Sequence, residues 1–239
     1  MMHNDFIIEN ASVVTPSGIL KSTSIKIEDG IIAEIREDAI NHHCSKIDAN
    51  GGYVLPGFID LHSDAIEKEI ETSPNSYFPA NIAVYELDKR LAACGITTIF
   101  QALSFAEGEI GVRSNKKAAE IIGEINRLSP KLNVKTRVHA RFEITDEDAV
   151  SYLEGLLNAG NIHLFSLMDH TPGQGQFKEV ASFKNYFGTV YKKSDDELNR
   201  IIDKKLNARE KMKDYIEDTI DLCKRHEIPL ASHYDDSEY

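Results

Sequence analysis

Short apolar or alternating runs, separated by turn residues, fill the first fifty or so residues, as is typical of a small β domain. The runs are Phe6 to Ile8, Val13 to Val14, Ser24 to Ile27 and Ile31 to Ile35. The turn residues Glu28, Asp29 and Gly30 predict a tight hairpin between the last two runs. We therefore expect residues 1–52 to form the N-terminal part of a small β domain.

From Tyr53 onward the pattern changes to strands alternating with helices, which indicates βαβ units and a parallel sheet. Strands are predicted at residues 54–61, 96–103, 134–144, 162–168 and 229–232, and helices at 82–94, 114–128, 146–159 and over most of 195–226. Five such strands fit either an open doubly wound sheet or an incomplete (β/α)8 barrel, which usually needs about 250 residues by itself. Residues 53–239 form this second predicted domain.

Composition is that of a globular protein, with 41% hydrophobic and 28% charged residues and no apolar run long enough to span a membrane. The N-terminus has no secretory pattern. The three cysteines, Cys44, Cys94 and Cys223, are scattered singly and form no pair, so we expect a cytoplasmic protein. The net charge of -12 argues against nucleic-acid and anionic-membrane partners. An anionic substrate would need a local cationic pocket or a metal.

Candidate metal ligands lie at or just beyond the carboxyl ends of the predicted strands, where parallel sheets place their chemistry. They are His62, Asp64, Glu143, His170 and His233. Mixed nitrogen and carboxylate ligands suit one or two divalent ions, with zinc first and manganese or iron as alternatives. His139 shares a strand face with Arg141 and Glu143, but a single histidine near a strand end is more often an ordinary hydrogen-bonded polar group.

Several residues are candidates for binding an anionic substrate. Arg113 precedes Ser114, a predicted helix N-cap, and Arg141 shares the face of Glu143; an internal ion pair is the alternative for each arginine. The loop after His170 contains Gly173 and Gly175, whose backbone amides can approach phosphate oxygens, although the loop also fits a connector. Lys178 follows this loop, and it is interpreted either as a residue of a lid over the site or as ordinary surface charge.

The segment GYVLPGFIDLH at residues 52–62 resembles the opening barrel strand of the metal-dependent amidohydrolase superfamily. Most members continue with HxH, whereas this chain has His62, Ser63 and Asp64, which points to a narrower group. The segments HSDAIEKEIE, ELDKRLAACGITTIFQALSF, HARFEIT and SLMDHTPGQGQF together resemble the diphosphatases of phosphonate metabolism. That resemblance implies an amidohydrolase-type TIM barrel, incomplete in this chain, beside a small N-terminal β-sandwich domain.

The resemblance also implies an activity and roles for the site residues. A water activated by metal would release pyrophosphate from alpha-D-ribose 1-methylphosphonate 5-triphosphate, with Glu143 as bridging carboxylate and Glu143, His170 and His233 as catalytic residues. The superfamily has an aspartate on its last barrel strand, which this sequence does not reach, so we expect weak turnover unless Asp235 or Asp236 replaces it. The open sheet edges favour a homo-oligomer.

Two other functions stay open. The same metal centre serves amidohydrolases that act on cyclic amides, N-acyl groups or aminated nucleobases. A shortened, catalytically silent relative that binds another chain is a different class of function.

Overall fold

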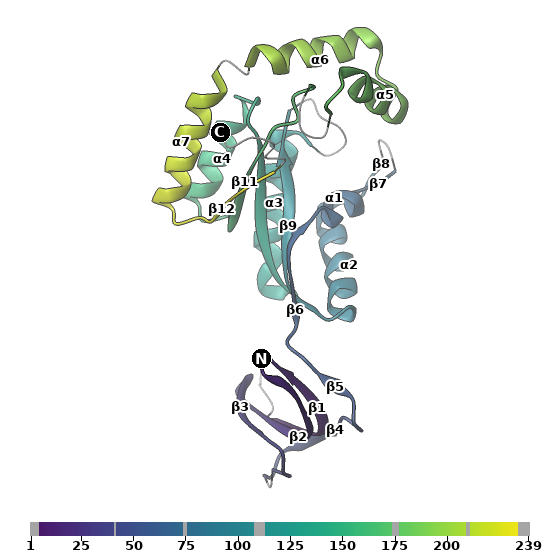
Figure 1. Cartoon of the computed structure of the whole chain (residues 1–239), viewed down its shortest axis with the longest axis vertical. Helices are drawn as coiled ribbons and strands as arrows, with labels where there is room; N and C mark the ends of the chain where they lie inside the picture. The colour runs from purple at the N-terminus through teal and green to yellow at the C-terminus, as the bar shows by residue number, and fades with distance from the viewer. Residues whose placement is uncertain are drawn as a thin grey trace. The chain divides into compact units, whose positions relative to one another are not determined.

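The computed structural model describes residues 5–40, 42–73, 76–107, 113–173, 177–208 and 211–233 (Figure 1). The chain divides into two compact units, residues 1–57 and residues 58–239. Among the described helices, none combines the length and the apolar character that crossing a membrane requires.

The first unit contains one five-stranded sheet in the order β3-β2-β1-β4, in which β5 also pairs with β1. Its strands are β1 (Phe6–Thr15), β2 (Gly18–Glu28), β3 (Ile31–Arg36), β4 (Ser45–Asp48) and β5 (Tyr53–Val54). The predicted hairpin turn between β2 and β3 is confirmed, since Asp29 and Gly30 have φ angles of 50° and 76°. The two-layered sandwich that the resemblance implies stays a prediction.

The second unit is built on five parallel strands in the order β12-β11-β10-β9-β6, so neighbours in the sheet follow one another along the chain. These strands are β6 (Phe58–Ser63), β9 (Ile96–Phe105), β10 (Lys135–Glu143), β11 (Leu164–Met168) and β12 (Leu230–Ser232). A small antiparallel ribbon joins β7 (Glu71–Ser73) to β8 (Ser76–Tyr77).

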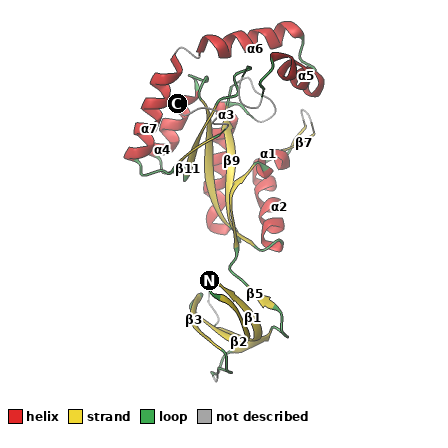
Figure 2. Ribbon diagram, in the orientation of Figure 1, coloured by secondary structure: helices red, strands yellow, loops and turns green. Residues whose placement is uncertain are grey.

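Helices follow the strands of this sheet (Figure 2). They are α1 (Ala65–Ile70), α2 (Ala80–Ala93), α3 (Asn115–Leu128), α4 (Ala149–Asn158), α5 (Val180–Tyr191), α6 (Asp195–Ala208) and α7 (Met212–Arg225), with a 3₁₀ turn at Ser129–Lys131. The predicted cap of α3 is confirmed, since the Ser114 hydroxyl accepts a hydrogen bond from the Lys117 amide at 3.2 Å.

Alternation along β10 divides the sheet into an apolar and a polar face. Val138, Ala140 and Phe142 are buried in one hydrophobic core with residues of α1, α2, α3, α4 and α7. The intervening residues of β10 point to the opposite face because side chains alternate along a strand. A doubly wound sheet would have helices on both faces, so packing of these helices against one face favours the other predicted fold, part of a (β/α) barrel.

Several local features of the structure differ from what the sequence predicts. The strand predicted at residues 54–61 is two strands, β5 and β6, because Pro56 has no amide hydrogen to donate and the chain changes sheets there. Helix α1 follows β6 directly and was not predicted. Helix α5 was also missed, and it packs with α6 in a separate core of Phe177, Phe183, Phe187, Leu198 and Ile202.

Candidate metal centre

Three side chains on the polar face of β10 organise the candidate site. His139, Arg141 and Glu143 follow one another at every second position, about 6.6 Å apart along the strand. All three are buried. Each belongs to a different cluster of polar side chains.

The first cluster contains three histidines from three strands. His62 comes from β6, His139 from β10 and His233 from the residue after β12, and one potential ligand atom of each lies within 4.8 Å of those of the other two. Their ring centroids are 5.1, 5.2 and 6.1 Å apart. The His233 amide donates to the Leu167 carbonyl at 3.0 Å, which ties this residue to β11. His139, which the sequence favours as an ordinary polar group, is thus part of the histidine cluster.

His139 is buried and His233 is partly buried, and this environment lowers the pKa of both rings. Burial, aided by His62, Arg141 and His233, lowers the pKa of His139 to about 4. Burial also lowers the pKa of His233, with contributions from His62, Arg141 and His170, while Asp64 opposes the shift. Neutral imidazole is the form that binds metal, so both rings are ready to act as ligands near neutral pH.

The cluster fits a divalent ion. Tetrahedral zinc with metal–nitrogen bonds of about 2.0–2.1 Å places its ligand atoms roughly 3.4 Å apart, so small side-chain rotations suffice for closure. Within the described residues, Nδ1 of His139 makes no hydrogen bond of good geometry, although the Leu61 carbonyl lies close enough to favour the protonated ring slightly. His62 is exposed, which leaves a side open, as a catalytic ion requires.

The second cluster joins Asp64 to Arg141. An Asp64 carboxylate oxygen lies 2.9 Å from the Arg141 guanidinium and 3.7 Å from Nε2 of His62, so this carboxylate lies between the histidine cluster and the arginine. The same Arg141 nitrogen donates to the Ser104 hydroxyl at 2.6 Å. Arg141 therefore forms the internal ion pair that was the alternative to phosphate binding.

The third cluster surrounds Glu143. Its carboxylate accepts hydrogen bonds from the Thr145 hydroxyl at 2.7 Å and from the His170 amide at 3.1 Å. Nδ1 of His170 lies 3.2 Å from the same carboxylate, and Nζ of Lys205 lies 3.2 Å from it as well. Glu143 follows His139 by four residues, about 13 Å along the strand. The structure thus groups the predicted ligands as His62 with His233, Asp64 beside them, and Glu143 with His170.

The predicted anion-binding residues that the structure describes make separate contacts. Arg113 is paired with the buried Glu67 at 3.1 Å, the alternative that the sequence left open. Gly173 has a φ of 106°, and its amide donates to the Phe177 carbonyl at 2.8 Å. Lys178 is exposed. Gly175, Asp235 and Asp236 lie outside the described residues.

Sequence reasoning did not single out Ser166 or Lys205. The Oγ of Ser166 lies 2.9 Å from Nε2 of His139, and Lys205 contacts Glu143 from α6. For Lys205 a signal was present, since it follows Leu198 and Ile202 at helical spacing and so falls on their apolar stripe. For Ser166 the partner depends on how β10 and β11 align.

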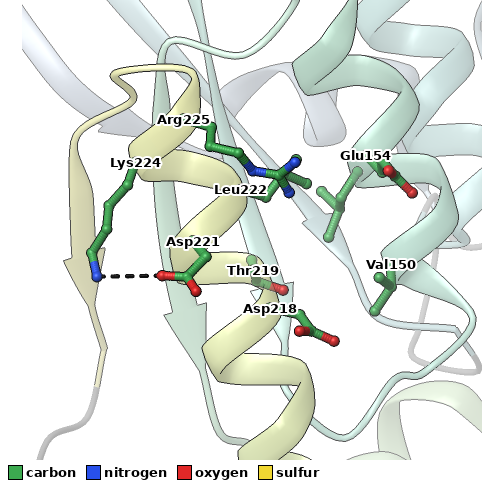
Figure 3. A pocket seen from close by; sticks show the side chains of 9 residues that line it. Val150, Glu154, Asp218, Thr219, Asp221, Leu222, Lys224 and Arg225 are labelled. Atoms are coloured by element: carbon green, nitrogen blue, oxygen red, sulfur yellow. Dashed lines mark hydrogen bonds and ion pairs between the residues drawn. The ribbon is translucent and has the colours of Figure 1, made fainter.

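A groove of about 600 Å³ lies between α4 and α7, and Figure 3 shows the side chains that line it. Its apolar residues are Val150, Leu153 and Leu222, and Lys224 pairs with Asp221 at 3.4 Å beside them. None of the candidate site residues that the structure describes lines this groove. The groove belongs to the helical layer, whereas the candidate site belongs to the polar face of the sheet.

Solved structures match this arrangement of strands and helices. A crystal structure of D-hydantoinase superposes with a TM-score of 0.52 at 20% identity over 77% of this chain and 43% of that chain. D-hydantoinase from Bacillus sp. AR9 gives a TM-score of 0.52 at 15% identity over 95% of this chain and 51% of that one. The fold is therefore that of part of the barrel in these D-hydantoinases.

At the level of sequence the chain is similar to the alpha-D-ribose 1-methylphosphonate 5-triphosphate diphosphatase of Escherichia coli (strain K12), with 28% identity over 232 residues. That match covers 96% of this chain and 61% of the relative. An L-hydantoinase of Paenarthrobacter aurescens is 35% identical over 99 residues, which are 41% of this chain and 20% of the relative. These matches confirm the resemblance found in the sequence motifs.

No protein-family profile matches the chain. The chain spans less than two thirds of the length of these curated relatives.

Proposed function

We propose that this chain carries the metal-binding part of a hydrolase that releases pyrophosphate from alpha-D-ribose 1-methylphosphonate 5-triphosphate. The observation that carries the proposal is the convergence of His62, His139 and His233 within 4.8 Å of one another on the polar face of a parallel sheet. Similarity to the Escherichia coli diphosphatase over 96% of the chain supports the choice of substrate.

The three histidines would hold the first divalent ion, with zinc as the first candidate. A bound ion supplies a Lewis acid and lowers the pKa of a coordinated water toward about 7. Asp64 lies 3.7 Å from His62 and is the nearest carboxylate among the predicted ligands. Glu143 and His170 form a second position with one carboxylate and one imidazole, and with His233 they are the proposed catalytic residues.

Residues of this chain would also position the substrate. Arg141 and Arg113 each balance a carboxylate, so each adds little net positive charge to the site. Lys178 is exposed, and we propose that this lysine contacts the triphosphate, whereas the amide of Gly173 is already bonded to the Phe177 carbonyl. A homo-oligomer, expected from the open sheet edges, is a proposal that sedimentation of the purified chain tests.

A hydantoinase-like activity is the second candidate. Two observations favour it: the barrel superposes on D-hydantoinase, and a stretch of 99 residues is 35% identical to an L-hydantoinase. Hydrolysis of a cyclic amide needs the same histidine-bound ion but no site for a triphosphate. The fate of the substrate therefore separates the two functions.

The test is to load the purified chain with Zn²⁺ and to assay it against the ribose triphosphate and against a hydantoin. We expect slow pyrophosphate release and no ring opening. His139→Gln should reduce both bound zinc and turnover at least tenfold. His226 is hydrogen-bonded to Asn158 away from the cluster, so the control variant His226→Gln should keep its zinc and its turnover. Ring opening without pyrophosphate release would select the second candidate, and zinc binding unaffected by His139→Gln would contradict the proposed ligand set.

A further inference from the structure

Lys205 is a lysine on the buried face of an amphipathic helix. The buried residues of α6 are Leu198, Ile202 and Lys205, which recur at the spacing of one helical stripe. Only 7% of Lys205 is exposed, whereas its neighbour Lys204 is exposed and lies 3.9 Å from Asp148. Burying an ammonium group is costly unless a partner balances its charge. The position of Lys205 therefore depends on a buried anion.

Glu143 is that anion. Its side chain is 2% exposed, and Nζ of Lys205 lies 3.2 Å from one of its oxygens. A carboxylate offers about four acceptor directions. The hydroxyl of Thr145, the amide and ring of His170 and the ammonium of Lys205 are all within hydrogen-bonding distance of the two oxygens. The carboxylate is thus both neutralised and largely saturated by groups of this chain.

A metal ion bound to Glu143 would compete directly with Lys205. An ion bound to the carboxylate oxygen that Lys205 contacts, at a metal–oxygen distance of about 2.0–2.2 Å, would lie no more than roughly 5 Å from Nζ, where two positive charges repel each other. The three ligands of the histidine cluster are imidazoles, so an ion bound there displaces no ion pair of its ligands, and the nearby Arg141 is held by Asp64 at 2.9 Å.

We propose that the ammonium of Lys205 is the resident cation of the second position, so that the centre takes one divalent ion, at His62, His139 and His233. The inference rests on the proposed function only in requiring that this histidine cluster binds metal. Glu143 then acts through its contacts with His170 and Lys205 instead of bridging two ions.

The experiment measures zinc bound per chain in the full chain, by native mass spectrometry and by elemental analysis after gel filtration. The wild type should bind one zinc. Lys205→Met, which removes the charge and keeps the apolar stem, should free the carboxylate and raise the value toward two. Lys204 is the adjacent lysine on the exposed side of the same helix, so Lys204→Met is the matched control and should bind one zinc.

Lys205→Met leaves the buried carboxylate of Glu143 without its cation, so the thermal stability of the variants must be compared as well. Glu143→Gln alone and Lys205→Met alone should lower the thermal midpoint, and the double variant should recover most of that loss and bind one zinc. Two zinc ions in the wild type, one of them lost in Glu143→Gln, would overturn this inference and leave the proposed hydrolase intact. A folded Lys205→Met that still binds one zinc would also overturn it, and no zinc in any form would overturn both proposals.

Discussion

The Nε2 atom of His139 lies 2.9 Å from the Oγ of Ser166, which links the adjacent strands β10 and β11 on their polar face. Ser166 pairs in register with Arg141, so its hydroxyl can reach the histidine two residues before. Partners of this kind orient a metal-binding imidazole and select its tautomer. Ser166 is thus a positioning residue for the histidine cluster.

Replacing Ser166 with alanine should weaken zinc binding by about tenfold, because the ring of His139 loses its orientation. A competition titration with a chelating dye measures the change. Ser151→Ala, an exposed serine of α4, is the control and should bind zinc as the wild type does. Equal affinities of the two variants would show that the hydroxyl does not orient the ligand.

Arg113→Gln should destabilise the fold, because it removes the cation that faces the buried Glu67. A buried charge that has lost its partner lowers the free energy of unfolding by about 1–3 kcal/mol, which urea unfolding measures. Arg127→Gln is the control, since Arg127 pairs with Glu124 on the exposed side of α3 and its loss should change the free energy of unfolding much less. If Arg113→Gln instead leaves stability unchanged and weakens substrate binding, the sequence-based role of Arg113 holds.

His163 should make stability depend on pH below neutrality. Its Nδ1 accepts a hydrogen bond from the Val138 amide at 3.2 Å, and burial, aided by Arg137 and Lys135, lowers its pKa from 6.5. A folded pKa below the unfolded one means that the unfolded chain binds the proton more readily. The stability that the neutral His163 ring contributes is therefore fully present above about pH 6.5, and it is lost as the pH falls through the pKa of His163 in the folded protein.

The comparison of urea unfolding at pH 8 and pH 5.5 tests this expectation. His163→Asn keeps a neutral acceptor but cannot take up a proton, so its stability should fall less between the two values. For a ring that is only partly buried, the difference is on the order of 0.5 kcal/mol. An identical loss in wild type and variant would exclude His163 as a source of acid sensitivity.

Two of the three cysteines, Cys94 and Cys223, should differ in reactivity. Burial raises the pKa of the Cys223 thiol to about 11, and the residue lies in the main core, whereas Cys94 is exposed. Because the thiolate is the reactive form, a thiol reagent at pH 8 should label Cys94 rapidly and Cys223 only after unfolding in denaturant. Rapid labelling of Cys223 in the native protein would contradict its place in the core.

Local sequence patterns were sufficient for much of the second unit. The 3.6-residue pattern after Ser114 predicted α3 together with its cap, and the alternation from residue 134 predicted β10 and its polar face. Residues 53–61 were harder, because β5 pairs with β1 in the first sheet, and a local pattern cannot tell which sheet a strand joins. Helix α1 has only six residues, too few for a clear helical period.

The sequence by itself determined which residues lie on the polar face of each strand, because side chains alternate with a period of two whatever the strand pairs with. It therefore named His62, Asp64, Glu143, His170 and His233 as polar side chains near strand ends. Only the tertiary structure decided that His139 joins His62 and His233, that Asp64 meets Arg141, and that Lys205 reaches Glu143. These contacts depend on how distant strands align and where α6 packs, and neither is encoded in the residues' local neighbourhood.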